Sequence, residues 1–176
     1  LLDQSARSVF RQNHSRFGNQ CCQIQAYYDT PLLASGLAIG LYGTGLFLHQ
    51  PKWRETGILL AGAHLLNANL TILSKSVFGR TRPFRGEGNQ QFHFLSKSYD
   101  HTSFPSGHTS NAFVFSTVLA HQIDWMPATV FLYSCASAVG MARIYYDQHW
   151  FSDVIAGACL GILSAHCVIR FYRASR

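Results

Sequence analysis

Five long stretches of the sequence contain no Asp, Glu, Lys or Arg, and apolar residues dominate them. They cover residues 31–50, 56–74, 101–123, 125–142 and 154–169. Apolar and polar positions do not alternate as they would in half-buried strands, and Ala, Gly and Leu are abundant, so each stretch predicts a helix. A helix that crosses a membrane needs about 20 mostly apolar residues, a length that the first three stretches reach and the last two approach.

The charged residues lie almost entirely between these stretches. Exposed helix faces of a soluble bundle would carry many more charges, whereas charged residues make up only 12% of this chain, against about 25% in average soluble domains. The low mean hydropathy of +0.05 favours the alternative, a soluble all-helical domain. We predict one all-α domain over residues 1–176, a transmembrane helical bundle with five spanning helices.

The first 30 residues precede this helical core of residues 31–176 and differ from it. Their arginines are interspersed with Val and Phe, a pattern typical of an amphipathic helix on a membrane interface and also of an ordinary solvated helix. Within the first apolar stretch, four glycines would permit close helix contact in a membrane bundle: Gly36, Gly40, Gly43 and Gly45. Residues 84–104 are polar and predict a long loop, which is uncommon unless it has a function.

The chain is basic, with a formal net charge of +6. A basic protein can bind nucleic acid, anionic lipid or phosphorylated substrates. A nucleic-acid surface needs clustered Lys and Arg with aromatic residues between them, but here the basic residues are spread singly. We therefore exclude nucleic acid and expect a phosphorylated or lipid partner.

The sequence KSVFGRTRP, residues 75–83, is the first candidate site segment. Lys75 and Arg82 are seven residues apart, so in one helix they would share a face, about 10 Å apart along its axis. Pro83 disfavours helical geometry at Arg82, and we expect the helix to end there. Two cations so placed could hold one anion between them, although basic side chains that snorkel at a membrane boundary show the same pattern.

The sequence PSGH, residues 105–108, directly precedes an apolar run. Ser106 is a candidate N-cap, and the amides of the residues after it would stay unpaired, which makes a ready phosphate site. Gly107 lets the backbone approach a ligand closely, and His108 would stand beside the anion as a general acid. A capped helix with an incidental histidine fits these four residues equally well.

The third segment, ARIYYDQHWFSD, covers residues 142–153. His149 and Asp153, four residues apart, would be neighbours on one helix face. The carboxylate could accept the imidazole N–H, fix its tautomer and leave the other ring nitrogen as a nucleophile. Arg143 offers a planar guanidinium for phosphate oxygens. The alternative is a structural ion pair at a helix start, where the helix dipole favours Asp.

Together the three segments form an ordered set that resembles the type 2 phosphatidic acid phosphatase (PAP2) superfamily, which also contains bacterial acid phosphatases and vanadium haloperoxidases. The family pattern is Lys, six residues, Arg-Pro; then Pro-Ser-Gly-His; then Ser-Arg, five residues, His, three residues and Asp. All spacings inside the motifs match, and the match covers residues 75–153. The one departure is Ala142, where the family has Ser.

The resemblance implies a phosphatase that needs no metal or other cofactor. His149 would attack phosphorus and form a phosphohistidine, Asp153 would orient it, and His108 would protonate the leaving oxygen and then activate water. The phosphoryl oxygens would be held by Lys75, Arg82, Ser106, Gly107 and Arg143. The sequence also lacks an Asp-rich cluster that would hold a metal.

The implied substrate is a lipid phosphate or diphosphate, since the apolar stretches beside the motifs would let a lipid tail reach the site. A soluble acid phosphatase of the same superfamily and a vanadium-dependent haloperoxidase are the alternatives. A phospholipid-binding protein would need the cations but neither His149 nor Asp153. If all five stretches cross the membrane, the motifs share one side, which we expect to be the extracytoplasmic side of a bacterial inner membrane.

Overall fold

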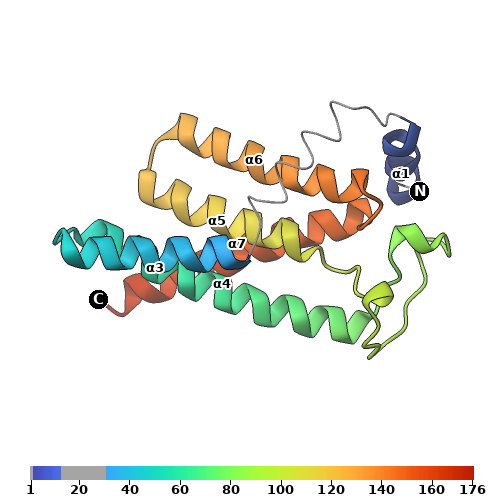
Figure 1. Ribbon diagram of the computed structural model, residues 1–176, viewed down its shortest axis with the longest axis horizontal. Coiled ribbons are helices and arrows are strands. Elements are labelled where there is room, and N and C mark those ends of the chain that lie inside the picture. The colour runs from blue at the N-terminus through green and yellow to red at the C-terminus, as the bar shows by residue number, and fades with distance from the viewer. Residues whose placement is uncertain (1, 13–30) are drawn as a thin grey trace.

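The computed structural model describes residues 2–12 and 31–176, without the side chains of residues 31–33. Helices account for most of these residues (Figure 1), and they are α1 Leu2–Gln12, α3 Pro31–Phe47, α4 Pro51–Phe78, α5 Gly107–Ile123, α6 Met126–Tyr145 and α7 Phe151–Ala174. Two short 3₁₀ turns, η1 Pro83–Arg85 and η2 Tyr99–His101, lie between α4 and α5. The predicted all-α class is confirmed, and each charge-free stretch corresponds to one α-helix, although in 101–123 the helix begins only at Gly107.

Helices α3 to α7 run alternately in opposite directions, so that their ends gather at the two ends of a bundle (Figure 1). Helix α5 contacts α4, α6 and α7, whereas α3 packs on α4. At one end, α4 and α6 finish and α5 and α7 begin, and the connection 79–106 lies there (Figure 1). Helix α1 packs against α6 and α7 at this same end (Figure 1).

Gly79 ends α4 four residues before Pro83. It adopts the left-handed conformation, with φ 57° and ψ 38°, and its N–H donates to the carbonyl oxygen of Lys75. A side chain at position 79 would overlap the carbonyl oxygen of His93, so the turn requires glycine. The prediction that the helix extends to Arg82 is therefore wrong, because a tertiary contact stops it earlier than the proline would.

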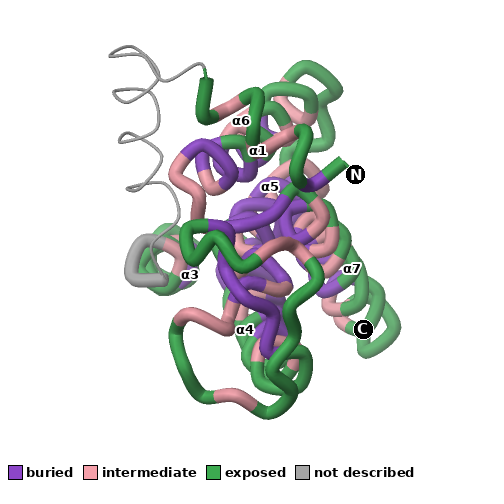
Figure 2. The backbone as a smooth tube through the Cα atoms, turned by 90° about the vertical axis from the view of Figure 1, so that its right-hand side faces the viewer, coloured by how far each residue is buried: buried purple, intermediate pink, exposed green. Residues whose placement is uncertain are grey.

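The buried residues lie in the middle of the bundle (Figure 2). Their apolar side chains form one cluster between α4, α5 and α7 and another between α5 and α6. The outer faces of the helices are apolar as well. Leu65 of α4, Phe131 of α6 and Leu163 of α7 are 67%, 67% and 66% exposed. A bundle in water would carry charged residues on such faces, whereas lipid solvates apolar side chains.

Two of the described helices, α4 and α7, are long and apolar enough to cross a membrane. The apolar part of α3, Ala34–Phe47, is shorter. Helix α5 has 17 residues, which gives a length of about 25 Å, less than the roughly 30 Å of a bilayer's hydrocarbon core. Five crossings therefore stay a prediction.

The glycines that bring helices close together are mostly not the predicted ones. Among the described residues, nothing lies within 4 Å of a Cβ built on three of the four: Gly36, Gly40 and Gly43. The fourth, Gly45, is close to α4, because its Cβ would lie 2.6 Å from the backbone nitrogen of Arg54. Close contact also occurs at Gly157 and Gly161 of α7, where a Cβ would collide with the carbonyl oxygens of Ser106 and Ser110. These two glycines, four residues apart on one face of α7, let its backbone approach the first turn of α5.

Helix α1 is the described part of the predicted N-terminal segment; residues 13–30, with Arg16, lie outside the described residues. Arg7 pairs with Asp147 at 2.6 Å, and the ring of Phe10 meets that of Tyr145 edge to face, with centroids 6.5 Å apart. Helix α1 therefore docks on the end of α6 and on the residues that follow it.

Candidate active site

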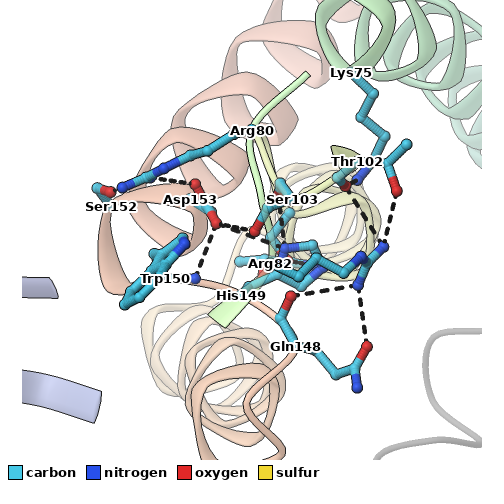
Figure 3. A network of polar contacts seen from close by, with 12 residues as sticks. Lys75, Arg80, Arg82, Thr102, Ser103, Gln148, His149, Trp150, Ser152 and Asp153 are labelled. Carbon is cyan, nitrogen blue, oxygen red and sulfur yellow. Dashed lines mark hydrogen bonds and ion pairs between the residues drawn. The ribbon is translucent and has the colours of Figure 1, made fainter. Parts of the chain in front are cut away.

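The three sequence motifs lie at the end of the bundle where α5 and α7 begin, and Figure 3 shows residues of the first and third motifs side by side. Each motif supplies residues from a helix end or from the connection next to it. In chain order, the residues are Lys75 in the last turn of α4, Arg82 in the connection that follows, Ser106 as the N-cap of α5 with Gly107 and His108 in its first turn, Arg143 in the last turn of α6, His149 in the next connection, and Asp153 in the first turn of α7.

Lys75 and Arg82 converge although they do not share a helix. The ammonium of Lys75 donates to the carbonyl oxygen of Thr102 at 2.5 Å, and Nη2 of Arg82 donates to the side-chain oxygen of the same residue at 3.2 Å. Nη1 of Arg82 donates to the side-chain oxygen of Gln148 at 3.1 Å. Both cations are thus held by neutral oxygens, which the oxygens of an anion can replace.

Arg143 contributes a buried donor. Its Nε is buried and has no hydrogen-bond partner in the part of the chain that the structure describes. An unpaired buried donor costs about 1–3 kcal/mol, a cost that a bound oxyanion would remove. The charges of Arg143, Lys75 and Arg82, as well as His149, act on the ring of His108. The three predicted cations and the two predicted histidines are therefore grouped in one site.

Ser106 caps α5, as the sequence predicts. Its Oγ accepts the N–H of Thr109 at 3.5 Å and lies 2.8 Å from the hydroxyl oxygen of the same residue. Ser106 is fully buried, so its hydroxyl is engaged inside the protein. Its own N–H donates to the carbonyl oxygen of Asp153 at 3.0 Å. This bond fastens the start of α5 to the start of α7.

His149 is buried in a position that determines its tautomer. Its Nδ1 lies 2.7 Å from the carbonyl oxygen of Ser103. Because a carbonyl oxygen only accepts, Nδ1 carries the proton, and Nε2 of the neutral ring keeps its lone pair. Helix α7 begins after His149, and the carboxylate of Asp153 lies 3.9 Å from Nδ1, too far for a hydrogen bond. The carbonyl of Ser103 thus fixes the tautomer, while Asp153 acts on the ring through its charge.

The carboxylate of Asp153 is fully buried and is held by three donors. Its Oδ1 pairs with Nη1 of Arg80 at 2.5 Å. Its Oδ2 accepts the hydroxyl of Ser103 at 2.5 Å and the N–H of Trp150 at 2.9 Å (Figure 3). These contacts leave the carboxylate little freedom to move relative to the imidazole of His149.

Arg80 and Ser103 are absent from the predicted site. Arg80 was visible as a further cation between Lys75 and Arg82, and Ser103 stands just before PSGH. Their partner Asp153 is 73 and 50 residues away along the chain, so no local spacing indicated the contacts.

Burial is the main cause of the pKa shifts of His149 and Arg82, the site residues that lie in the connections between helices. Burial lowers the pKa of His149 to about 4; Asp153 opposes this shift, and the charges of Lys75 and Arg82 reinforce it. The ring is therefore neutral at pH 7, as a nucleophile must be. Burial also lowers the pKa of Arg82, and the charge of Arg143 adds to the effect, but an arginine remains charged at neutral pH.

Known proteins resemble this chain over the segment that carries the motifs. Residues 56–176 match the family model of the PAP2 superfamily. A lipid A 1-phosphatase from Porphyromonas gingivalis is 31% identical over 137 residues, which are 76% of this chain and 27% of that protein. The chain thus spans about a quarter of the length of this relative.

Two crystal structures share the fold. LpxE from Aquifex aeolicus has a TM-score of 0.78 and 25% identity, over 97% of this chain and 96% of that chain. The first transmembrane PAP2 type phosphatidylglycerolphosphate phosphatase from Bacillus subtilis has a TM-score of 0.68 and 19% identity, over 99% of this chain and 86% of that chain.

Proposed function

The chain belongs to the PAP2 superfamily, and we propose that it is a metal-independent phosphatase that hydrolyses a lipid phosphate or diphosphate through a phosphohistidine. The state of His149 is the observation that carries this proposal. Its ring is buried, its Nδ1–H is held by the carbonyl oxygen of Ser103, and its Nε2 keeps a lone pair in the presence of three cations. A neutral, oriented imidazole next to an anion site is suited to attack on phosphorus.

The phosphoryl group binds to Lys75, Arg82 and Arg143 and to the first amides of α5. The buried Nε of Arg143 has no hydrogen-bond partner in the described structure, and the amide of Gly107, the first residue of α5, has no intrahelical partner. Ser106 takes part through the cap that it forms rather than through its engaged hydroxyl. These groups supply the charge stabilisation that Mg²⁺ supplies in other phosphoryl-transfer enzymes.

The reaction has two steps. In the first, Nε2 of His149 forms a bond to phosphorus while the ester P–O bond breaks, and His108 gives its proton to the leaving oxygen. In the second, His108 takes a proton from water, which attacks the phosphohistidine and releases inorganic phosphate and neutral His149. The charge of Asp153, 3.9 Å from Nδ1, stabilises the ring while it is positively charged.

A groove between α3 and α4 supports a lipid substrate. It has a volume of about 690 Å³, and apolar residues of the two helices form most of its lining. Asn111 of α5 also lines the groove, and it lies about one helical turn after His108. A phosphate at the start of α5 thus leaves an apolar chain room to extend along the groove.

The chain is a membrane protein, as the two long apolar helices and the transmembrane fold of the neighbours indicate. We further propose that it lies in a bacterial inner membrane with the site on the extracytoplasmic side. Ser98 is exposed in the connection near the site. In a cysteine-free background, Ser98→Cys should react with a membrane-impermeant reagent in intact cells. Protection until the cells are opened would place the site in the cytoplasm.

Phosphate release from purified protein tests the function. The assay uses detergent with EDTA and a panel of phosphatidic acid, phosphatidylglycerophosphate, a prenyl diphosphate and lipid A. We expect release from at least one lipid, its loss in His149→Ala, and normal release in the control His166→Ala, which removes an exposed histidine of α7. Turnover only of water-soluble phosphomonoesters would indicate a soluble acid phosphatase, and activity only with vanadate and peroxide a haloperoxidase.

A further inference from the structure

Arg80 connects Asp153 to the N-terminal helix, and the protein itself uses every donor of its guanidinium. Nη1 donates to Asp153 at 2.5 Å and to the hydroxyl of Ser152 at 2.7 Å. Nη2 donates to Asp3 at 2.7 Å and to the carbonyl oxygen of Asn89 at 2.6 Å, and Nε donates to the same carbonyl at 3.1 Å. A guanidinium has five N–H donors, so none remains for a phosphate oxygen.

The carboxylate of Asp3 is as firmly placed as the guanidinium. It is 8% exposed, and its Oδ1 accepts the N–H of Ser152 at 2.8 Å while its Oδ2 accepts the hydroxyl of Ser152 at 2.8 Å. Burial alone would raise the pKa of Asp3, but the hydrogen bonds from Ser152 and Arg80 outweigh it and hold the pKa below its usual value. Asp3 is therefore charged at neutral pH, and it pairs one of the amides that the start of α7 leaves open.

We propose that Asp3 is a positioning residue for the active centre, which acts on Asp153 through Arg80. The inference rests on the proposed function. Asp3 and Asp153 hold different nitrogens of one guanidinium, so the direction in which Arg80 presents Nη1 to Asp153 depends on Asp3. The anchored Asp153 in turn keeps its other oxygen toward His149.

Asp3 also affects His149 through the net charge of the group formed by Asp3, Arg80 and Asp153. Arg80 lies between two carboxylates, so the three residues together carry one negative charge. That charge stabilises His149 when its ring becomes positive. Without the charge of Asp3, Arg80 neutralises Asp153, and the positive ring loses its counter-charge. Helix α1 is by this account part of the active centre, not only a segment that lies on the surface of the bundle.

A merely structural role for Asp3 would consist of holding α1 in place, and Arg7 offers a matched control for it. The ion pair of Arg7 with Asp147, at 2.6 Å, also fastens α1 to the body of the protein. The side-chain hydrogen bonds of Arg7 in the described structure go to Asp147, and its guanidinium also lies over the ring of Trp150, 5.5 Å from the centroid. Asp3→Asn and Arg7→Gln therefore each remove one ion pair of α1, but only the ion pair of Asp3 includes Arg80.

The test measures kcat and KM for phosphate release from a short-chain phosphatidic acid by the full chain in detergent. Groups that orient a functional side chain from one layer out are worth roughly 10- to 100-fold in activity. We expect Asp3→Asn to lower kcat about tenfold while KM stays within about twofold, since phosphate binding is untouched. Arg7→Gln should keep kcat within about twofold. Thermal unfolding checks that each variant is folded.

The double variant separates action through Arg80 from other effects. Arg80→Lys keeps the charge but loses the planar fork that bridges the two carboxylates. In that background, adding Asp3→Asn should lower kcat no further, because the path is already interrupted. Independent, multiplied losses would overturn the proposal, as would equal losses in Asp3→Asn and Arg7→Gln.

The wild-type protein separates failure of this proposal from failure of the proposed function. If the wild type releases no phosphate from any lipid of the panel, the proposed function fails and this inference fails with it. If the wild type is active and Asp3→Asn retains full kcat, only the role of Asp3 is refuted.

Discussion

A single methyl group added at Gly157 would disturb the active centre by pushing α5 and α7 apart. A Cβ at this position would lie 2.5 Å from the carbonyl oxygen of Ser106. Ordinary contact begins at 3.4 Å, so the two helices must separate by about 0.9 Å in an interior that is already closely packed. The displaced residue caps α5 and binds the backbone of Asp153, so the amide site and the histidines would shift relative to each other.

A displacement of about 1 Å can lower the rate of an enzyme roughly 100-fold, and we expect kcat/KM of Gly157→Ala to fall by about that factor. Overpacking costs about 1–3 kcal/mol, and the higher helix propensity of Ala returns up to about 1 kcal/mol. The free energy of unfolding should therefore fall by at most about 3 kcal/mol, and thermal unfolding shows whether the variant remains folded under the conditions of the assay.

The assay is phosphate release from a short-chain phosphatidic acid, together with thermal unfolding in detergent. Gly36→Ala is the matched control, because nothing among the described residues lies within 4 Å of its Cβ. It should keep wild-type activity. Wild-type kcat/KM in Gly157→Ala would refute the reasoning that contact between α5 and α7 positions the site.

Three further predictions concern the titrating residues of the site. The pKa of His149 is about 4 in the folded protein, against 6.5 for an unperturbed histidine, so at this residue the unfolded chain binds more protons between these values. His149 should therefore contribute a loss of stability on the order of 3 kcal/mol as the pH of the unliganded protein falls from about 6.5 to about 4. Thermal unfolding of His149→Gln should show a loss smaller by this amount, and a loss equal to that of the wild type would contradict the assignment. Asp153→Asn should lower kcat by at least about 100-fold, because the positive ring of His149 loses its counter-charge, whereas Asp147→Asn, away from the ring, should not; equal kcat values would refute this role. His108→Asn should slow the hydrolysis of an alkyl phosphate far more than that of an aryl phosphate with a good leaving group, since only the former needs a proton; equal losses would remove His108 as the acid.

The helices could be predicted because the pattern that defines them is local. Charges are excluded from 31–50 and from the four later stretches, and each of these corresponds to one helix. The end of α4 could not be placed in this way. Pro83 sets the last position that the helix could reach, but Gly79 ends it earlier through a turn packed on His93, a contact that depends on the fold of the whole connection.

The same distinction applies to the active centre. The spacing of the motifs predicts the residues that would touch substrate, and the structure places the cations and histidines together. The residues that hold them could not be predicted from spacing. Asp153 meets Arg80 across 73 residues, and Asp3 meets Ser152 across 149. Such partners become neighbours only when α1, the connection 79–106 and α7 meet.

The glycines in close contact also show why composition alone does not predict which helices approach each other. The glycines of α3 are the more conspicuous in the sequence, yet Gly36, Gly40 and Gly43 have no neighbour within 4 Å in the described structure. Backbone atoms crowd Gly157 and Gly161 of α7, as they do Gly45 and Gly57 where α3 meets α4. A small residue permits close approach, but which helix face meets a partner is decided by the packing of α5 against α7.

The most direct test of the account is to look for phosphate on His149 during turnover. Full-length protein is mixed with phosphatidic acid that carries a radiolabelled phosphate, quenched in alkali, and digested for peptide mapping, with His108→Asn used to slow hydrolysis of the intermediate. The account predicts an alkali-stable, acid-labile label on His149 that is absent from His149→Ala and present in His166→Ala. Label on another residue, or full phosphate release by His149→Ala, would contradict it.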